Sequence, residues 1–169
     1  LLFDLDGTLL DSRKFLVNTS FEVLETFYPG RFTVDDIVEE FGNGFVRLLP
    51  DKESETSQRA REKYHAIKTE KYHLTPLFPG VLEGLRTLRE QGLKLGLVTN
   101  QNKELSIEAL RENRIFDFFD VIIAPTDVRE AKPSPEGILK AMQQLGCRKQ
   151  EVTMIGDSRY DIMAGERAG

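Results

Sequence analysis

Four short apolar runs, each closed by polar residues, place the strongest limit on how this chain of 169 residues can fold. These runs are Leu1–Leu5, Leu93–Thr99, Asp120–Ala124 and Glu151–Gly156. Short apolar runs bounded by polar residues are typical of strands buried on both faces of a parallel sheet. Amphipathic helical patterns separate the later runs, and Gly92 and Gly146 follow two of these patterns, where a helix C-terminus favours a left-handed residue. The alternation predicts an α/β core in which right-handed crossovers place helices on both faces of the sheet.

The long interval after the first run contains no strand-like pattern. It carries three helical patterns instead, at residues 15–27, 34–41 and 51–72. We therefore predict a small helical domain at 11–76, inserted into a core domain formed by 1–10 and 77–169. The chain starts inside an apolar run and stops after a helical stretch, so we expect the core domain to be truncated at both ends.

Composition excludes several classes of protein. Asp and Glu outnumber Lys and Arg by 28 to 23, so there is no broad basic surface for nucleic acid. No apolar run approaches the about 20 residues that a membrane span requires. The single cysteine, Cys147, excludes an internal disulfide and suits a reducing compartment. We expect a cytoplasmic monomer or homodimer that binds neither nucleic acid nor membranes.

The first run delivers two carboxylates where ligands bind in open α/β sheets, at the carboxyl ends of the strands. Asp4 and Asp6 are two residues apart, so along a strand both side chains face the same way. Neighbouring carboxylates repel each other unless a cation or a shared proton offsets the repulsion. Gly7 allows a sharp exit from the strand. The alternative interpretation of this segment is a surface Asp-Gly turn.

The other runs are also followed by polar side chains. Thr99 and Asn100 can donate to anionic oxygens beside a helix N-terminus, or they can simply cap that helix. Lys132 offers a positive charge before a proline-rich helix start, although a lone loop lysine is commonly just solvated. Asp157 and Asp161 form a second pair of carboxylates one helical turn apart, and acidic residues are also common at helix starts.

In combination these strand ends supply acids, a hydroxyl group and a lysine to one edge of the sheet. Several carboxylates with few histidines and no thiol cluster favour a hard cation, Mg²⁺ above others. Such a cation with a lysine and a hydroxyl around a carboxylate indicates phosphoryl rather than acyl chemistry. The sequence has no Gly-x4-Gly-Lys-Ser/Thr loop, which excludes a P-loop nucleotidase.

The four segments, in this order, resemble the motifs of haloacid dehalogenase superfamily phosphatases. The matching residues are the segment 4–8 (DLDGT), Thr99, Lys132-Pro133 and Asp157-Ser158 with Asp161. The resemblance covers almost the whole chain, and the helical insertion resembles the helical (C1-type) cap of that superfamily. It implies a Rossmann-like three-layer α/β/α core with an inserted cap, and hydrolysis of a small phosphorylated metabolite.

The resemblance also implies catalytic roles. Asp4 would be the nucleophile that forms a phosphoaspartyl intermediate. Asp6 would protonate the leaving group and then activate water. Thr99 and Lys132 would hold the phosphoryl oxygens and stabilise their charge.

A metal site is implied in the same way. Mg²⁺ would be held by Asp4, by the backbone carbonyl of Asp6 and by Asp157. Ser158 and Asp161 would support these ligands, with Asp161 orienting a metal-bound water or Lys132.

The substrate is less defined. Asp6 favours phosphate esters, because the true dehalogenases of the superfamily lack this second acid. The cap segment 42–47 (GNGFVR) resembles the substrate loop of phosphoglycolate phosphatases: Gly44 would approach a small ligand closely and Arg47 would pair with its carboxylate. Thr8 and Asn100 complete the predicted substrate-binding set. The alternative for the loop is a helix break with a surface arginine.

Other functions share these features. Sugar-phosphate mutases of the β-phosphoglucomutase type and some pyrophosphatases have the same motifs and a similar cap. A non-catalytic phosphate or metal binder, such as a receiver-like module phosphorylated on Asp4, is a further alternative. A receiver needs neither a cap nor the segment 6–8, so the sequence favours the enzyme.

Overall fold

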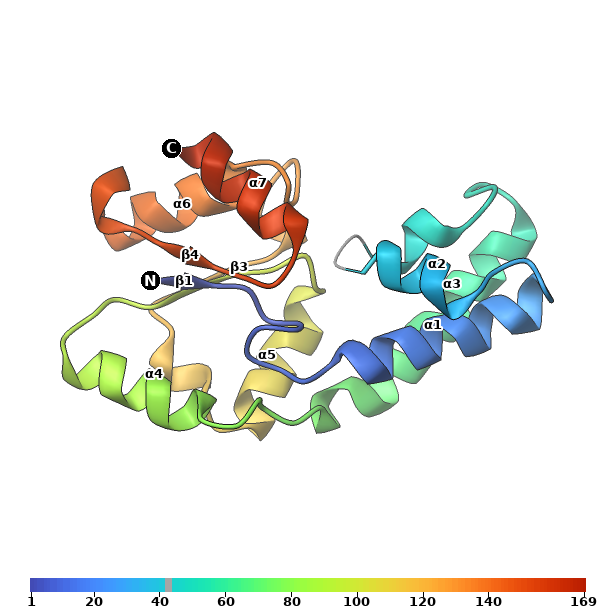
Figure 1. The fold of residues 1–169 in the computed structure, drawn as a ribbon, viewed down its shortest axis with the longest axis horizontal. Coiled ribbons are helices and arrows are strands. Elements are labelled where there is room, and N and C mark those ends of the chain that lie inside the picture. The colour runs from blue at the N-terminus through green and yellow to red at the C-terminus, as the bar shows by residue number, and fades with distance from the viewer. Residues whose placement is uncertain (42–43) are drawn as a thin grey trace.

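The computed structural model describes residues 1–41 and 44–169 and has two parts, a sheet-centred core and a helical cap (Figure 1). The core holds a parallel four-stranded sheet of order β3-β2-β1-β4. Its strands are β1 (Leu2–Phe3), β2 (Gly96–Val98), β3 (Val121–Ile123) and β4 (Met154–Ile155). All four apolar runs thus contribute strands, as predicted. Each strand is shorter than its run, because the ends of the runs form the loops that enter and leave the sheet.

Side chains of the sheet alternate between its two faces, as the period of two in a strand requires. Phe3 and Leu97 pack on one face with residues of α4 (Val81–Glu90) and α5 (Lys103–Glu112). Their neighbours Leu2 and Val98 pack on the other face with α6 (Glu136–Leu145) and α7 (Arg159–Ala168). Figure 1 shows the two helix pairs on opposite sides of the sheet. The predicted three-layer α/β/α core is confirmed.

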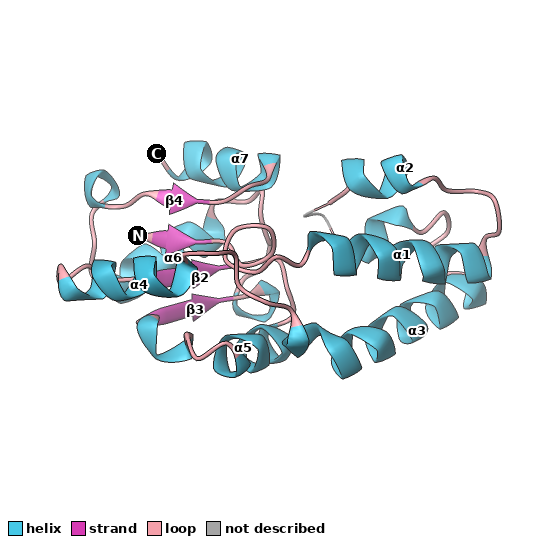
Figure 2. Ribbon diagram, turned by 60° about the horizontal axis from the view of Figure 1, so that its bottom comes forward, coloured by secondary structure: helices cyan, strands magenta, loops and turns pink. Residues whose placement is uncertain are grey.

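The cap contains the helices α1 (Arg13–Phe27), α2 (Val34–Glu39) and α3 (Glu55–Lys71). The three helical patterns of the sequence are therefore confirmed as helices. The cap has its own hydrophobic cluster, in which α1 packs against α3 around the fully buried Ala60. Figure 2 shows the cap beside the ends of the strands rather than on a face of the sheet.

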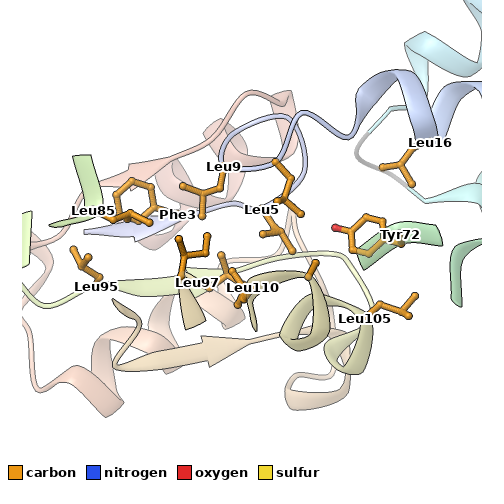
Figure 3. Close-up of a cluster of buried hydrophobic side chains, with 13 residues drawn as sticks. Phe3, Leu5, Leu9, Leu16, Tyr72, Leu85, Leu95, Leu97, Leu105 and Leu110 are labelled. Atoms are coloured by element: carbon orange, nitrogen blue, oxygen red, sulfur yellow. The ribbon is translucent and has the colours of Figure 1, made fainter. Parts of the chain in front are cut away.

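The chain crosses twice between core and cap, and the two crossings lie side by side. The backbone N–H of Asp11 donates to the carbonyl of Pro76 at 2.9 Å, and Leu10 and Leu77 form an isolated β-bridge. The domain limits at 10/11 and 76/77 stay a prediction. Figure 3 shows that the hydrophobic cluster of the core extends to this junction, where it includes Tyr72 and Leu16. The connection of the cap is therefore packed as part of the core.

Across the described ranges, none of the helices combines the length and apolar character needed to cross a membrane.

Candidate active site

The polar side chains that follow the strands converge at one end of the sheet. Asp4 follows β1, Thr99 follows β2, Lys132 precedes α6, and Asp161 lies in the first turn of α7. All four residues are buried, although each is polar or charged. Asp4, Thr99 and Lys132 line a cavity of about 100 Å³ that residues of the cap line on its other side. The structure thus brings together the residues that the sequence placed at strand ends, while their catalytic roles stay predictions.

A single ammonium group lies between two buried carboxylates. The Nζ atom of Lys132 is 2.7 Å from Oδ1 of Asp4 and 2.5 Å from Oδ1 of Asp161. It also donates to the backbone carbonyl of Val98 at 2.8 Å, so all three of its N–H bonds have an acceptor. Buried charges require such pairing, because removal from water is costly for each of them. Lys132 is therefore the central cation of the site.

Asn100 holds the backbone of Lys132. Its Oδ1 accepts from the N–H of Lys132 at 2.9 Å, and its Nδ2 donates to the carbonyl of Lys132 at 3.0 Å. Asn100 also lines the cavity, so its predicted substrate-binding role stays a prediction. The contacts give it a second task, which is to fix the lysine loop against the end of β2.

Burial raises the pKa of Asp4 to about 7, although the adjacent Lys132 ammonium acts in the opposite direction. In the unfolded chain this carboxyl titrates near its ordinary value of 3.8. The folded state therefore binds the extra proton between these two values, and the free energy of unfolding decreases as the pH rises through that interval.

We expect this contribution to be visible when divalent cations are removed. Between about pH 4.5 and about pH 7.5, the free energy of unfolding should fall by more in the unmodified protein than in an Asp4→Asn variant. The measurement is urea denaturation in EDTA at several pH values. Equal decreases in the two proteins would show that Asp4 does not titrate in this range.

Three carboxylates at this edge are close enough to share a cation. One oxygen from each of Asp4, Asp157 and Asp161 lies within 4.8 Å of the other two. Carboxylate oxygens are the ligands that hard cations such as Mg²⁺ prefer, so the donor set fits that ion. Asp157 was predicted as a ligand, whereas Asp161 was predicted only to support one; the geometry places both side chains in the group. Burial raises the pKa of Asp157, and the hydroxyl of Thr8 donates to its Oδ1 at 3.4 Å.

Two glycines make room for these acids. Gly7 has a φ of +80°, and a Cβ atom there would lie 2.3 Å from Oδ2 of Asp157. At Gly156 an added Cβ would lie 2.3 Å from Cγ of Asp161. Any larger residue at either position would have to displace a carboxylate, so both glycines are part of how the sequence builds the site.

Ser158 positions Asp161 through the N-terminal cap of α7. Its Oγ accepts from the N–H of Asp161 at 3.3 Å, and its own N–H donates to Oδ2 of Asp161 at 3.0 Å. This reciprocal pair is a capping box, which satisfies donors at the start of a helix. It leaves Oδ1 of Asp161 directed at Lys132. Support of the metal ligands by Ser158 stays a prediction.

Asp6 is held by donors that the sequence analysis did not identify. Its Oδ1 accepts from the hydroxyl of Tyr72 at 2.8 Å, and its Oδ2 accepts from Nε2 of Gln101 at 3.0 Å. Gln101 in turn accepts from Nζ of Lys68 at 2.6 Å. Burial and the negative charge of Asp6 raise the pKa of Tyr72, so its hydroxyl stays protonated and donates. The position of Gln101 directly after Thr99 and Asn100 could have identified it as a site residue from the sequence. Nothing in the sequence indicated that Tyr72 or Lys68 belongs to the site.

The predicted substrate loop is brought to the cavity only in part. Gly44 lines the cavity, whereas the exposed Arg47 borders an adjoining hollow that shares Asn100 and Lys132 with the cavity. Arg47 lies in the 3₁₀ turn Phe45–Leu48, whose Phe45 ring stacks on Tyr64 with 4.2 Å between the ring centres. The pairing of Arg47 with a substrate carboxylate stays a prediction. The first two residues of this predicted loop, Gly42 and Asn43, lie outside the described residues.

Known proteins resemble the chain over its full length. Residues 1–169 match the family model of haloacid dehalogenase-like hydrolases. The pyrophosphatase PpaX of Halalkalibacterium halodurans is 38% identical over 172 residues, which cover 99% of this chain and 79% of that protein.

Solved structures agree with this match. A protein of Bacteroides fragilis assigned as a haloacid dehalogenase-like hydrolase superposes with a TM-score of 0.87 at 32% identity, covering 99% of this chain and 82% of that one. A protein of Lactobacillus plantarum assigned as a phosphoglycolate phosphatase superposes with a TM-score of 0.84 at 26% identity, with coverages of 99% and 81%. The chain that carries these four motifs on a capped three-layer core therefore belongs to the haloacid dehalogenase-like hydrolases.

Proposed function

We propose that this protein is a Mg²⁺-dependent phosphohydrolase that transfers the phosphoryl group of a small metabolite first to Asp4 and then to water. The observation that carries this proposal is the environment of Asp4. Its carboxylate opens onto the cavity, has Lys132 at 2.7 Å, and belongs to the group of three carboxylates that fits a hard cation.

The first step forms a bond between a carboxylate oxygen of Asp4 and phosphorus, while the bond from phosphorus to the leaving oxygen breaks. Asp6 gives its proton to that leaving oxygen. Lys132 and the hydroxyl of Thr99 stabilise the charge on the phosphoryl oxygens. A Mg²⁺ ion held by Asp4 and Asp157 would supply further charge neutralisation at the phosphoryl group.

The second step uses Asp6 in the opposite direction. As a carboxylate it takes a proton from water, the water oxygen attacks phosphorus, and the bond from phosphorus to Asp4 breaks, which releases phosphate and restores both acids. Tyr72 and Gln101 each donate a hydrogen bond to Asp6, so both of its side-chain oxygens are held in position beside the cavity.

The cap supplies the surroundings in which this chemistry proceeds. Apolar side chains of the cap cover the cavity opposite the acids; they are Leu16, Val17, Ile37, Phe41, Phe45 and Leu48. Such a cover keeps bulk water from the phosphoryl group and strengthens the electrostatic interactions inside. The space is small, which favours a compact substrate over a nucleotide or a large sugar phosphate.

Two compact substrates are the leading candidates. Phosphoglycolate is suggested by the resemblance of the cap loop, and the structural relative from Lactobacillus plantarum carries that name. Inorganic pyrophosphate is suggested by the 38% identical relative, which is named a pyrophosphatase. A sugar-phosphate mutase is the remaining alternative, and its main product would be an isomerised sugar phosphate instead of free phosphate.

Phosphate release from phenyl phosphate tests the proposal. We expect release to require Mg²⁺, to stop in EDTA and to return when excess Mg²⁺ is added. An Asp157→Asn variant should need at least about tenfold more Mg²⁺ for half-maximal rate, because it loses a charged ligand.

The matched control is Asp117→Asn, which removes an exposed carboxylate from the turn before β3, at the end of the sheet where the parallel strands begin. It should keep the Mg²⁺ requirement of the unmodified protein. Undiminished release in EDTA would contradict the metal requirement. An unchanged Mg²⁺ requirement in Asp157→Asn would contradict the assignment of the ligand.

A further inference from the structure

One cation of the cap faces the cavity. Lys68 lies in α3, and among the described residues that line the cavity it is the positively charged side chain contributed by the cap. The other lining cation, Lys132, belongs to the core and is occupied by Asp4 and Asp161. The other cap residues in this lining are mostly apolar, and the polar or acidic ones among them are Ser20, Glu40 and Tyr64. Burial of an ammonium group among such side chains costs free energy unless an acceptor or an anion compensates for it.

Lys68 is held in place without being neutralised. Its Nζ donates to Oε1 of Gln101 at 2.6 Å and lies 5.3 Å and 5.4 Å from the ring centres of Tyr64 and Tyr72. Within residues 1–41 and 44–169 it forms no ion pair with a carboxylate. Burial lowers the pKa of Lys68, against the attraction of the more distant Asp6. An anion bound in the cavity would remove this electrostatic penalty.

The position of Lys68 relative to the two acids indicates which part of a substrate it would meet. Gln101 bridges Lys68 to Asp6, with hydrogen bonds of 2.6 Å and 3.0 Å. Asp6 is the residue that protonates the leaving oxygen in the function proposed above. Lys132, by contrast, contacts the nucleophile Asp4 and so serves the transferred phosphoryl group. In the proposed reaction, Lys132 would therefore act on the transferred phosphoryl group and Lys68 on the side of the leaving group.

We propose that Lys68 selects substrates whose leaving group carries a second negative charge, either a carboxylate or a second phosphate. The inference rests on the proposed phosphohydrolase function and adds the chemical class of the leaving group. Lys68 has three donors and Gln101 accepts one, so two remain for an anion. Arg47, the cation that the sequence suggested for this task, does not line this cavity but borders the hollow that adjoins it.

The test compares three substrates of similar size: 2-phosphoglycolate and pyrophosphate, whose leaving groups are anionic, and ethyl phosphate, whose leaving group is neutral. A Lys68→Met variant keeps the length of the side chain and removes its charge. We expect kcat/KM for at least one anionic substrate to fall by about a hundredfold more than kcat/KM for ethyl phosphate. The substrate with the larger loss identifies the anion as a carboxylate or a phosphate.

Two further variants complete the design. Lys68→Arg keeps the charge and should keep the preference for anionic leaving groups. Lys71→Met removes an exposed lysine from the last turn of the same helix and should leave all three kcat/KM values unchanged. Because the readout is a ratio between substrates on one preparation, a loss of folded protein cancels.

The outcomes separate this inference from the function on which it rests. Equal losses for all three substrates in Lys68→Met would mean that Lys68 only orients Gln101, and the inference would be wrong. It would also be wrong if the unmodified protein hydrolysed ethyl phosphate as well as either anionic compound. If no substrate gave Mg²⁺-dependent phosphate release, including phenyl phosphate, the proposed function itself would fail.

Discussion

Replacing Asp4 with asparagine is expected to reduce kcat for phosphate release by at least about a thousandfold, since an amide cannot act as the nucleophile. The loss should be similar for every substrate, because the phosphoaspartyl intermediate is common to all of them. Quenched single-turnover reactions with a substrate labelled in its phosphoryl group should find label on the unmodified protein and none on the variant.

The control for this substitution is Asp11→Asn. Asp11 is an exposed carboxylate seven positions further along, and its backbone N–H rather than its side chain donates the hydrogen bond to Pro76. It should retain full activity. Turnover of Asp4→Asn within about tenfold of the unmodified protein, with label still attached, would exclude Asp4 as the nucleophile.

Replacing Lys132 with methionine is expected to lower the free energy of unfolding by about 3–5 kcal/mol, as for the loss of one partner from a buried ion pair. The substitution leaves Asp4 and Asp161 facing each other with side-chain exposures of only 10% and 2%. Urea denaturation in EDTA, at a pH where both carboxyl groups ionise in the unfolded chain, measures the loss. Activity should disappear as well, because the cation also stabilises the phosphoryl oxygens in the proposed reaction.

Lys103→Met is the matched control for stability. Lys103 also lies 2.7 Å from a carboxylate, that of Asp127, but the side chains of this pair are 31% and 20% exposed. Water screens such a pair, so its loss should cost about 1 kcal/mol or less. In a protein that already carries Asp161→Asn, Lys132→Met should lower the free energy of unfolding by less, because only one buried carboxylate is then left without its lysine partner. Equal losses for Lys132→Met and Lys103→Met would contradict the role of burial.

The fold could be predicted from the sequence because its signals are local. An apolar run such as Leu93–Thr99 followed by a helical pattern needs no knowledge of the rest of the chain. The same holds for the cap, where the pattern at residues 15–27 became α1 (Arg13–Phe27). Strand lengths were less accessible, because the ends of a strand depend on where its neighbours stop pairing.

The candidate site also has a part that could be predicted from the sequence and a part that could not. Asp4, Thr99, Lys132 and Asp157 follow strands, and topology alone brings the ends of parallel strands together. The contact between Tyr72 and Asp6 joins residues 66 positions apart, and only the packing of cap on core decides it. Lys68 looks like any lysine on a charged helical face until that packing is known. Arg47 was suggested by its loop sequence, and the structure places it at the hollow that adjoins the cavity rather than in the lining of the cavity itself.

Tyr72 lies in the segment through which the chain returns from the helices to the sheet, and its hydroxyl is bonded to Asp6. Suppose that the helical cap, the lid of this site, were replaced together with this returning segment by those of another hydrolase. The chimera would then lose the hydroxyl donor of Tyr72 as well as its original substrate specificity. The lid is thus not an exchangeable module: any graft would have to keep the tyrosine, or rebuild an equivalent donor, before its effect on substrate range could be judged.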